Sequence, residues 1–259
     1  MKNINIFINT FKIQIINSFS RSMFKYTLII SPILNLIFLY YIFEKSNITN
    51  LGGYIVITSS VMSIWSCMCF SSIGDIMREK LNGTLVSIYL SPVNFKLLIF
   101  IKILGNTFLA MVTFFVSFFM AKLLFNTKFI IYYPYLFCFA LLMTIICFLI
   151  ISMFFSYLLT ISRKTGLYMN LLEIPIIYFC GLAFPVNILP YQIQIIGKIF
   201  PITYSIKLIR MSLKIEPVNV SFDIIFKLFV TLLLFVCLFV VVSKMFDSKI
   251  NIQGNLEMY

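Results

Sequence analysis

Residues 75–92 read DIMREKLNGTLVSIYLSP and lie between two long apolar stretches, Gly52–Ile73 and Leu97–Phe125. The segment gathers four charged residues in a chain in which only 11% of all residues are charged. About 20 apolar residues in a helix cross the ~30 Å hydrocarbon core of a bilayer, so both neighbouring stretches are long enough to span it. The pattern predicts a short polar helix held between two membrane spans, where a structure outside the bilayer can make contact.

The composition places the chain among helical membrane proteins that cross the bilayer several times. Hydrophobic residues make up 61% of its 259 residues, well above the fraction found in soluble enzymes. We expect an all-α integral membrane protein in which residues 1–259 form one transmembrane domain. Six stretches are predicted to span the membrane, roughly Tyr26–Phe43, Gly52–Ile73, Leu97–Phe125, Phe129–Leu159, Leu167–Phe184 and Ile224–Val242, the fourth helix starting at Pro134.

The first segment, residues 1–22, has the pattern of an amphipathic helix. Its apolar residues are spaced rather than contiguous, and no small-residue cleavage site follows them, so it does not read as a secretory signal peptide. We expect a helix that lies on the cytoplasmic leaflet, and a polar tail is the alternative. The predicted apolar face consists of Ile4, Phe7, Ile8, Phe11, Ile15 and Phe19, with Asn5, Asn9, Lys12 and Asn17 between them.

Lysine and arginine residues predict the orientation, because they accumulate in the cytoplasmic loops of membrane proteins. Six spans put both termini on one side, and cytoplasmic termini place twelve of the 20 basic residues inside. We therefore expect a multi-pass protein of the cell membrane with both termini cytoplasmic. The net charge of +12 favours contact with anionic lipid headgroups rather than nucleic acid. The inner residues are Lys2, Lys12, Arg21, Lys25, Arg78, Lys80, Lys96, Lys102, Arg163, Lys164, Lys244 and Lys249.

The chain lacks the residue clusters that catalysis or metal binding requires. It has no histidine, and its six cysteines fall inside apolar runs, where a thiol packs as a small hydrophobic group. We therefore predict no catalytic, cofactor-binding or metal site. A membrane-embedded enzyme is disfavoured for the same reason. A secondary transporter is an alternative, although no pair of repeated, broken spans is present.

A second informative region, residues 185–214, follows the fifth predicted span. Pro185, Pro190 and Pro201 punctuate it, yet it is rich in isoleucine, leucine and tyrosine. We expect two short helices, about Tyr191–Phe200 and Pro201–Lys214, that re-enter the outer leaflet. A loop that only anchors the chain to the membrane surface is the alternative. On the second helix, Lys207, Arg210 and Lys214 form a basic stripe opposite Ile202, Ile206, Ile209 and Leu213.

Glu173 is the one acidic residue well inside a predicted span. A carboxylate at that depth is costly unless it is paired or hydrated. Lys102 in the third span lies at a comparable depth and is a possible partner. Two roles remain open for Glu173, a polar point on a transport pathway and a residue that packs helices together.

Two motifs in the chain resemble those of ABC-2 type permeases. Glu79-Lys80-Leu81-Asn82-Gly83-Thr84-Leu85, followed by Leu90-Ser91-Pro92, is similar to the family's E-x-x-x-G-T-L…P pattern after the second span. The stretch from Gly181 through Pro185, Pro190 and Pro201-Ile202-Thr203-Tyr204 to Arg210 is similar to its F-P…L-P…P-L-T-Y…R pattern before the last span. Cys180, Ile202 and Arg78 depart from the family pattern.

The resemblance implies a permease subunit powered by a partner. In such permeases the loop between spans two and three docks on a separate ATP-binding cassette subunit, present in two copies, and a second permease copy completes the pathway. ATP and Mg²⁺ would be bound by that partner, because this chain has no G-x-x-x-x-G-K-[ST] loop. The expected ATPase-coupling residues are Asp75, Met77, Arg78, Glu79, Lys80, Gly83, Thr84 and Leu85 in the coupling region 75–92, and a solvated loop without a partner is the alternative. The expected residues of the outer re-entrant gate are Pro185, Pro190, Pro201, Tyr204, Lys207 and Arg210.

We therefore expect the transmembrane subunit of an ATP-driven ABC exporter that acts as a homodimer. The resemblance implies efflux, and the phenylalanine, methionine and isoleucine of the spans suit an amphiphilic cargo such as a drug, an antimicrobial peptide or a lipid-linked compound. A permease that exports polysaccharide or teichoic acid is the alternative, because Arg21-Ser22-Met23-Phe24-Lys25 resembles the basic entry to the first span in that branch.

Overall fold

The computed structural model describes residues 2–46, 50–91, 93–126, 129–161, 165–215 and 221–253, and within these ranges it contains helices and no strand. The all-α prediction is confirmed. The α-helices are α1 (Lys2–Ser20), α2 (Ser22–Phe43), α3 (Leu51–Met68), α4 (Gly74–Leu81), α5 (Thr84–Tyr89), α6 (Phe95–Ala110), α7 (Val112–Phe125), α8 (Pro134–Ile161), α9 (Thr165–Phe179), α10 (Tyr191–Ile199), α11 (Pro201–Ser212) and α12 (Phe222–Gln253). A π-helix, η1 (Cys69–Ile73), joins α3 to α4, and a 3-10 turn, η2 (Val186–Ile188), precedes α10.

Five helical stretches of the described residues are long and apolar enough to cross a membrane. They are Ser22–Phe43, Leu51–Leu81, Phe95–Phe125, Pro134–Thr160 and Phe222–Asp247. The first residue of α8 is Pro134, as predicted, and the long third stretch is divided into α6 and α7 at Met111.

The expected fifth span, Leu167–Phe184, is a shorter helix than the sequence predicts. It corresponds to α9, whose 15 residues rise about 22 Å, less than the thickness of a hydrocarbon core. Gly181 has a φ of 75°, a left-handed conformation that ends the helical path and turns the chain toward α10. The predicted fifth helix is therefore present but does not reach spanning length.

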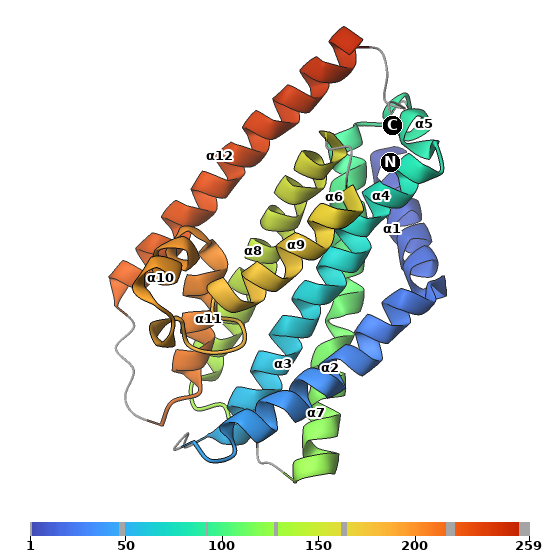
Figure 1. Cartoon of the computed structure of the whole chain (residues 1–259). Helices are drawn as coiled ribbons and strands as arrows, with labels where there is room; N and C mark the ends of the chain where they lie inside the picture. Colours follow the sequence, from blue (N-terminus) through green and yellow to red (C-terminus); the bar gives the residue numbers. More distant parts are fainter. Residues whose placement is uncertain are drawn as a thin grey trace.

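The polar segment 75–92 and the helix α11 lie toward opposite ends of the bundle (Figure 1). At one end, the Phe246 ring of α12 packs 5.9 Å from Tyr89 of α5, between ring centroids. At the other end, the Nδ2 of Asn50 donates to the carbonyl oxygen of Ile130 at 2.7 Å, and the backbone N–H of Tyr133 donates to Ser212 O at 3.2 Å. The two motif-bearing regions therefore lie at opposite ends of the helical bundle, and their assignment to the two faces of the membrane stays a prediction.

Helix α3 forms the centre of the fold. All residues from Gly52 to Met68 are buried, and Trp65 packs against Phe148 of α8 with 5.4 Å between ring centroids. Two interior serines of α3 satisfy their hydroxyls locally, since Ser59 and Ser60 both donate to Val56 O, at 3.0 and 2.6 Å. Helix α3 therefore packs against α2, α6, α7, α8 and α9.

Candidate functional site

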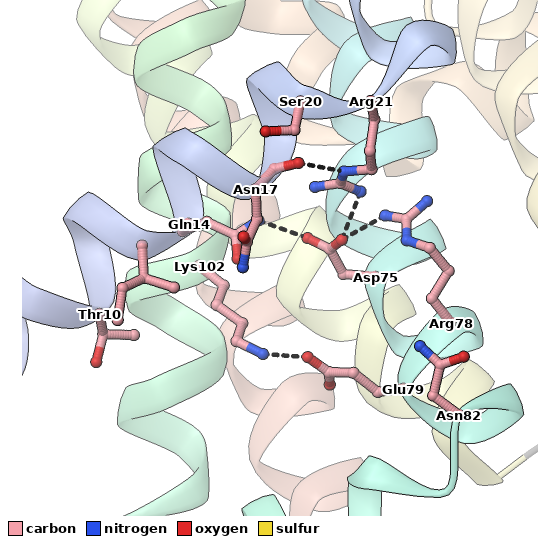
Figure 2. Close-up of a pocket in the computed structure, with 11 residues that line it drawn as sticks. Thr10, Gln14, Asn17, Ser20, Arg21, Asp75, Arg78, Glu79, Asn82 and Lys102 are labelled. Carbon is pink, nitrogen blue, oxygen red and sulfur yellow. Dashed lines mark hydrogen bonds and ion pairs between the residues drawn. The ribbon is translucent and has the colours of Figure 1, made fainter.

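A polar cluster joins α1, α4 and α6 at the end of the bundle that carries the segment 75–92 (Figure 2). At its centre is the carboxylate of Asp75. Its Oδ1 accepts from Nη1 of Arg21 at 2.7 Å and from Arg78, and its Oδ2 accepts from Gln14 Nε2 at 2.7 Å and from Asn106 Nδ2 at 3.2 Å. Two guanidinium groups and two amides thus offset the cost of burying this carboxylate.

The face of α1 that packs on the protein carries polar side chains at its centre. Gln14 and Ser18 are buried, and both are bonded to Asn106 of α6, with Ser18 Oγ 2.6 Å from Asn106 Oδ1. Hydrogen bonds among amide and hydroxyl groups therefore fix α1 against α6.

The exposed face of α1 carries Phe7, Ile8 and Phe19 of the predicted apolar face. Phe11 and Ile15 are half-buried, and the side chain of Ile4 lies outside the described residues. The helix over residues 1–22 is therefore found as Lys2–Ser20. Its polar side, which the sequence pattern assigns to water, is divided between the protein at Gln14 and the solvent at Lys12.

A second ion pair links α4 to α6 and corrects one prediction. Lys102 of α6 pairs with the Glu79 carboxylate of α4, so the predicted pairing of Lys102 with Glu173 is wrong. Equal depth along two separate helices does not make two side chains meet, and the fold brings Glu79 of α4 within reach of Lys102 of α6. The cavity between α1, α4 and α6 has a volume of about 370 Å³ and is lined by Thr10, Ile13, Gln14, Asn17, Ser20, Arg21, Asp75, Arg78, Glu79, Asn82 and Lys102.

The turn between α4 and α5 projects from the bundle. Gly83 has a φ of 66°, and its N–H donates to Lys80 O at 3.1 Å, so this glycine turns the chain just after the end of α4. Leu81 is 74% exposed and Leu90 is 75% exposed, and Asn82 and Thr84 are exposed as well. We call residues 81–84 together with Leu90 the tip.

The coupling region is anchored below the tip by buried side chains. Ile76 and Leu85 are 3% and 2% exposed, so Leu85 holds the segment in place rather than contributing surface. Met77, Arg78, Glu79 and Lys80 are half-buried. Aromatic packing continues the anchor, because Tyr89 of α5 contacts Phe95 of α6 and Phe246 of α12, at 5.5 and 5.9 Å between ring centroids. Pro92 lies outside the described residues.

At the opposite end, α10 and α11 match the two short helices predicted for residues 185–214. The predicted basic stripe on α11 is not formed, because Lys207 and Lys214 are exposed whereas Arg210 is half-buried. The Arg210 guanidinium lies 5.2 Å from the centroid of the Tyr54 ring, and its Nη2 donates to Leu182 O at 3.2 Å. Burial lowers the pKa of Arg210, and the nearby Tyr54 opposes that change.

The other residues predicted for the outer gate lie at the starts of short helices or bond within this segment. Pro185 and Pro190 precede η2 and α10, and Pro201 is the first residue of α11. The Tyr204 hydroxyl donates to Lys198 O at 3.0 Å, which ties α11 to α10. These contacts make α10 and α11 one packed unit on the bundle.

Glu173 lies in the interior of α9 and faces α3. The indole N–H of Trp65 donates to its backbone carbonyl at 3.3 Å, and the Ser66 hydroxyl hydrogen bonds to its carboxylate. Among the described residues no group of three or more His, Cys, Asp or Glu side chains could hold a metal ion.

Sequence reasoning missed Gln14, Ser18 and Asn106, which together surround Asp75. The spacing of Gln14 and Ser18 by four residues was a usable signal, because it places two polar side chains on one face of the amphipathic helix.

A family model described as ABC-2 type transporter matches residues 7–214, which is most of the chain. No curated protein matches the sequence.

Proposed function

The chain belongs to the ABC-2 type transporter family and is a membrane permease subunit that works with an ATP-binding subunit, and we propose that it drives export of an amphiphilic cargo by docking its tip on that subunit. In the proposed assembly two copies of the permease form the pathway and two ATP-binding subunits hold ATP and Mg²⁺. Both termini and the tip face the cytoplasm, and α10 and α11 lie at the outer side.

The observation that carries the proposal is the contrast between the tip and its anchor. Leu81 and Leu90 are about three-quarters exposed, whereas Ile76 and Leu85 on the same segment are buried. Exposed leucines at the polar end of a membrane protein are not explained by contact with hydrocarbon, and they suit a protein partner. The tip exposes two leucines to a partner and is anchored by buried side chains of the same segment. A movement of a bound partner would therefore be transmitted to the helical bundle.

The polar cluster supports transmission from the tip to three helices. Asp75 ties α4 to α1 and to the start of α2 through Gln14 and Arg21, and Glu79 ties it to α6 through Lys102. A displacement of α4 must therefore carry these helices with it or break charged hydrogen bonds. Closure of the ATP-binding subunits would in this way bias the permease between inward-facing and outward-facing arrangements.

The test is co-purification of the full chain with an ATP-binding subunit, followed by ATP hydrolysis and transport in proteoliposomes. Leu81→Asn or Leu90→Asn is expected to reduce association with that subunit at least tenfold. Ile188→Asn is the matched control, because Ile188 is 68% exposed but lies in η2 with the outer elements. Equal association of all three variants with the wild-type value would refute docking through the tip.

A further inference from the structure

Glu173, in the interior of α9, is a half-buried carboxylate without a cationic partner among the described residues. Five ion pairs are formed in that part of the chain, by Asp75 with two arginines, by Glu79, by Asp223 and by Asp247, and none includes Glu173. Lys102, which the sequence suggested as its partner, is bound to Glu79. Burying a carboxylate among apolar groups costs free energy unless a cation or hydrogen-bond donors compensate its charge.

The surroundings of Glu173 are hydrogen-bonding but carry no charge. Ser66 contacts the carboxylate, and on the same face of α3 lies Ser63, whose Oγ accepts from Asn35 Nδ2 of α2 at 3.2 Å. We call Asn35, Ser63, Ser66 and Glu173 the polar seam. It runs between α2, α3 and α9 and has one anionic group. Ser31 of α2, which accepts from Asn35 Nδ2 at 3.4 Å, adds another uncharged hydroxyl, and most other residues of α2 and α9 are apolar.

This chemistry selects one class of ligand. An apolar surface with a single carboxylate complements a molecule that has a hydrophobic body and one positive group, and it rejects an anion of the same shape. The half-buried state of Glu173 and Asn35 means that the seam is not sealed inside the helices. Trp65, the only tryptophan in the chain, is fully buried and donates to the backbone carbonyl of Glu173, so its fluorescence can report on changes at this position.

We propose that the Glu173 carboxylate in the polar seam recognises the cationic group of the transported amphiphile. This inference rests on the proposed export function and narrows its cargo to lipophilic cations. The ligand enters with its positive group toward Glu173, and the Ser66 hydroxyl holds the carboxylate in position. A neutral or anionic amphiphile lacks this contact.

Trp65 supplies a built-in reporter for the test. The full chain in nanodiscs of zwitterionic lipid is titrated with tetraphenylphosphonium, and with tetraphenylborate as an anion of matched shape, while tryptophan fluorescence and binding of the radiolabelled probe are measured. The wild type is expected to bind the cation saturably and to show no saturable response to the anion. Glu173→Gln is expected to weaken cation binding at least tenfold, and Glu173→Asp by no more than about threefold.

Asp223→Asn is the matched control, because it removes a carboxylate that is exposed and paired with Lys227 near the start of α12. It is expected to bind the cation as the wild type does. The proposal is overturned if wild-type chain shows no saturable cation binding, if the anion binds equally, or if Glu173→Gln retains wild-type affinity.

A second measurement needs no variant and so does not depend on the folding of Glu173→Gln. Dicyclohexylcarbodiimide adds to a protonated carboxyl group in an apolar site and remains attached as an N-acylurea, which mass spectrometry locates. Tetraphenylphosphonium is expected to slow labelling of Glu173 at least fivefold, and tetraphenylborate to leave the rate unchanged. Equal labelling rates with and without the cation would overturn the proposal. If the complex with the ATP-binding subunit transports a cargo but these binding tests fail, only the cargo class is refuted, whereas absence of that complex refutes the proposed function itself.

Discussion

Arg21 and Asp75, 54 positions apart in the sequence, are joined by a 2.7 Å contact between Nη1 and Oδ1. Arg21 lies between α1 and α2, and its other nitrogens are bonded to Asn17 O and to Ser18 Oγ. Asp75 lies in the first turn of α4. One guanidinium therefore fastens the entry to the first span to the helix that leads to the tip.

The Arg21–Asp75 contact is expected to stabilise the fold as well as to link two elements. Asp75→Asn leaves Arg21 and Arg78 without their shared carboxylate, so we expect a loss of about 3 kcal/mol in the free energy of unfolding. Arg21→Gln is expected to cost somewhat less, because Asp75 keeps Arg78. A double-mutant cycle measured by unfolding in detergent should give a coupling energy above about 1 kcal/mol. Additive effects of the two substitutions would contradict the contact.

The Glu79–Lys102 pair permits a charge-swap experiment. Glu79→Lys places two cations together between α4 and α6, and it is expected to reduce ATP hydrolysis by the permease–ATPase complex severalfold. Glu79→Lys combined with Lys102→Glu restores opposite charges at the same site and should recover most of the activity. If the double variant is as impaired as Glu79→Lys alone, Glu79 acts through the partner subunit and not through Lys102.

Gly83 sets the direction of the tip through its left-handed backbone. The φ of Gly83 is 66°, a value that alanine adopts only with strain. Gly83→Ala is therefore expected to lower the free energy of unfolding by about 1 kcal/mol and to reduce the ATP hydrolysis of the complex. Gly83→Asn should be milder, because asparagine adopts this conformation more readily than alanine. The comparison is made on complexes matched for the amount of permease. Equal activity of the alanine and asparagine variants would argue against backbone strain as the cause.

Arg210 and Lys207 lie on one short helix but in different surroundings. Arg210 contacts the Tyr54 ring and Leu182 O, whereas Lys207 is exposed. Arg210→Ala is expected to lower the free energy of unfolding by about 2 kcal/mol and to impair transport, and Arg210→Lys to recover little because it loses the planar group. Lys207→Ala should behave like the wild type. The prediction fails if the two alanine variants have the same thermal stability and transport rate.

Features governed by local chemistry were predictable from the sequence. The glycine that ends α4, the proline that starts α8 and the two helices α10 and α11 follow from backbone preferences at Gly83, Pro134 and Pro201. The all-α membrane fold follows from the length of the apolar runs. The shortness of α9 was not predictable from hydropathy, because its apolar run continues to Phe184 while the helix stops before the left-handed Gly181.

The partners of the charged residues were not predictable in the same way. Glu79 and Lys102 are 23 positions apart, and only the fold, which brings α4 within side-chain reach of α6, decides that they meet. Gln14 and Asn106, 92 positions apart, are brought together by the docking of α1. The direction of Arg210 likewise depends on Tyr54 of α3, which no spacing along α11 reveals.

The most direct test of docking through the tip is site-specific cross-linking. A benzophenone maleimide is attached to Asn82→Cys, which lies in the exposed tip, and to Gln192→Cys in α10 at the opposite end, with the unsubstituted chain as background. After illumination of the complex with its ATP-binding subunit, Asn82→Cys is expected to give a permease–ATPase adduct whose yield changes when ATP is added. Gln192→Cys should give none. An adduct from Gln192→Cys, or none from Asn82→Cys in an intact complex, would contradict docking through the tip.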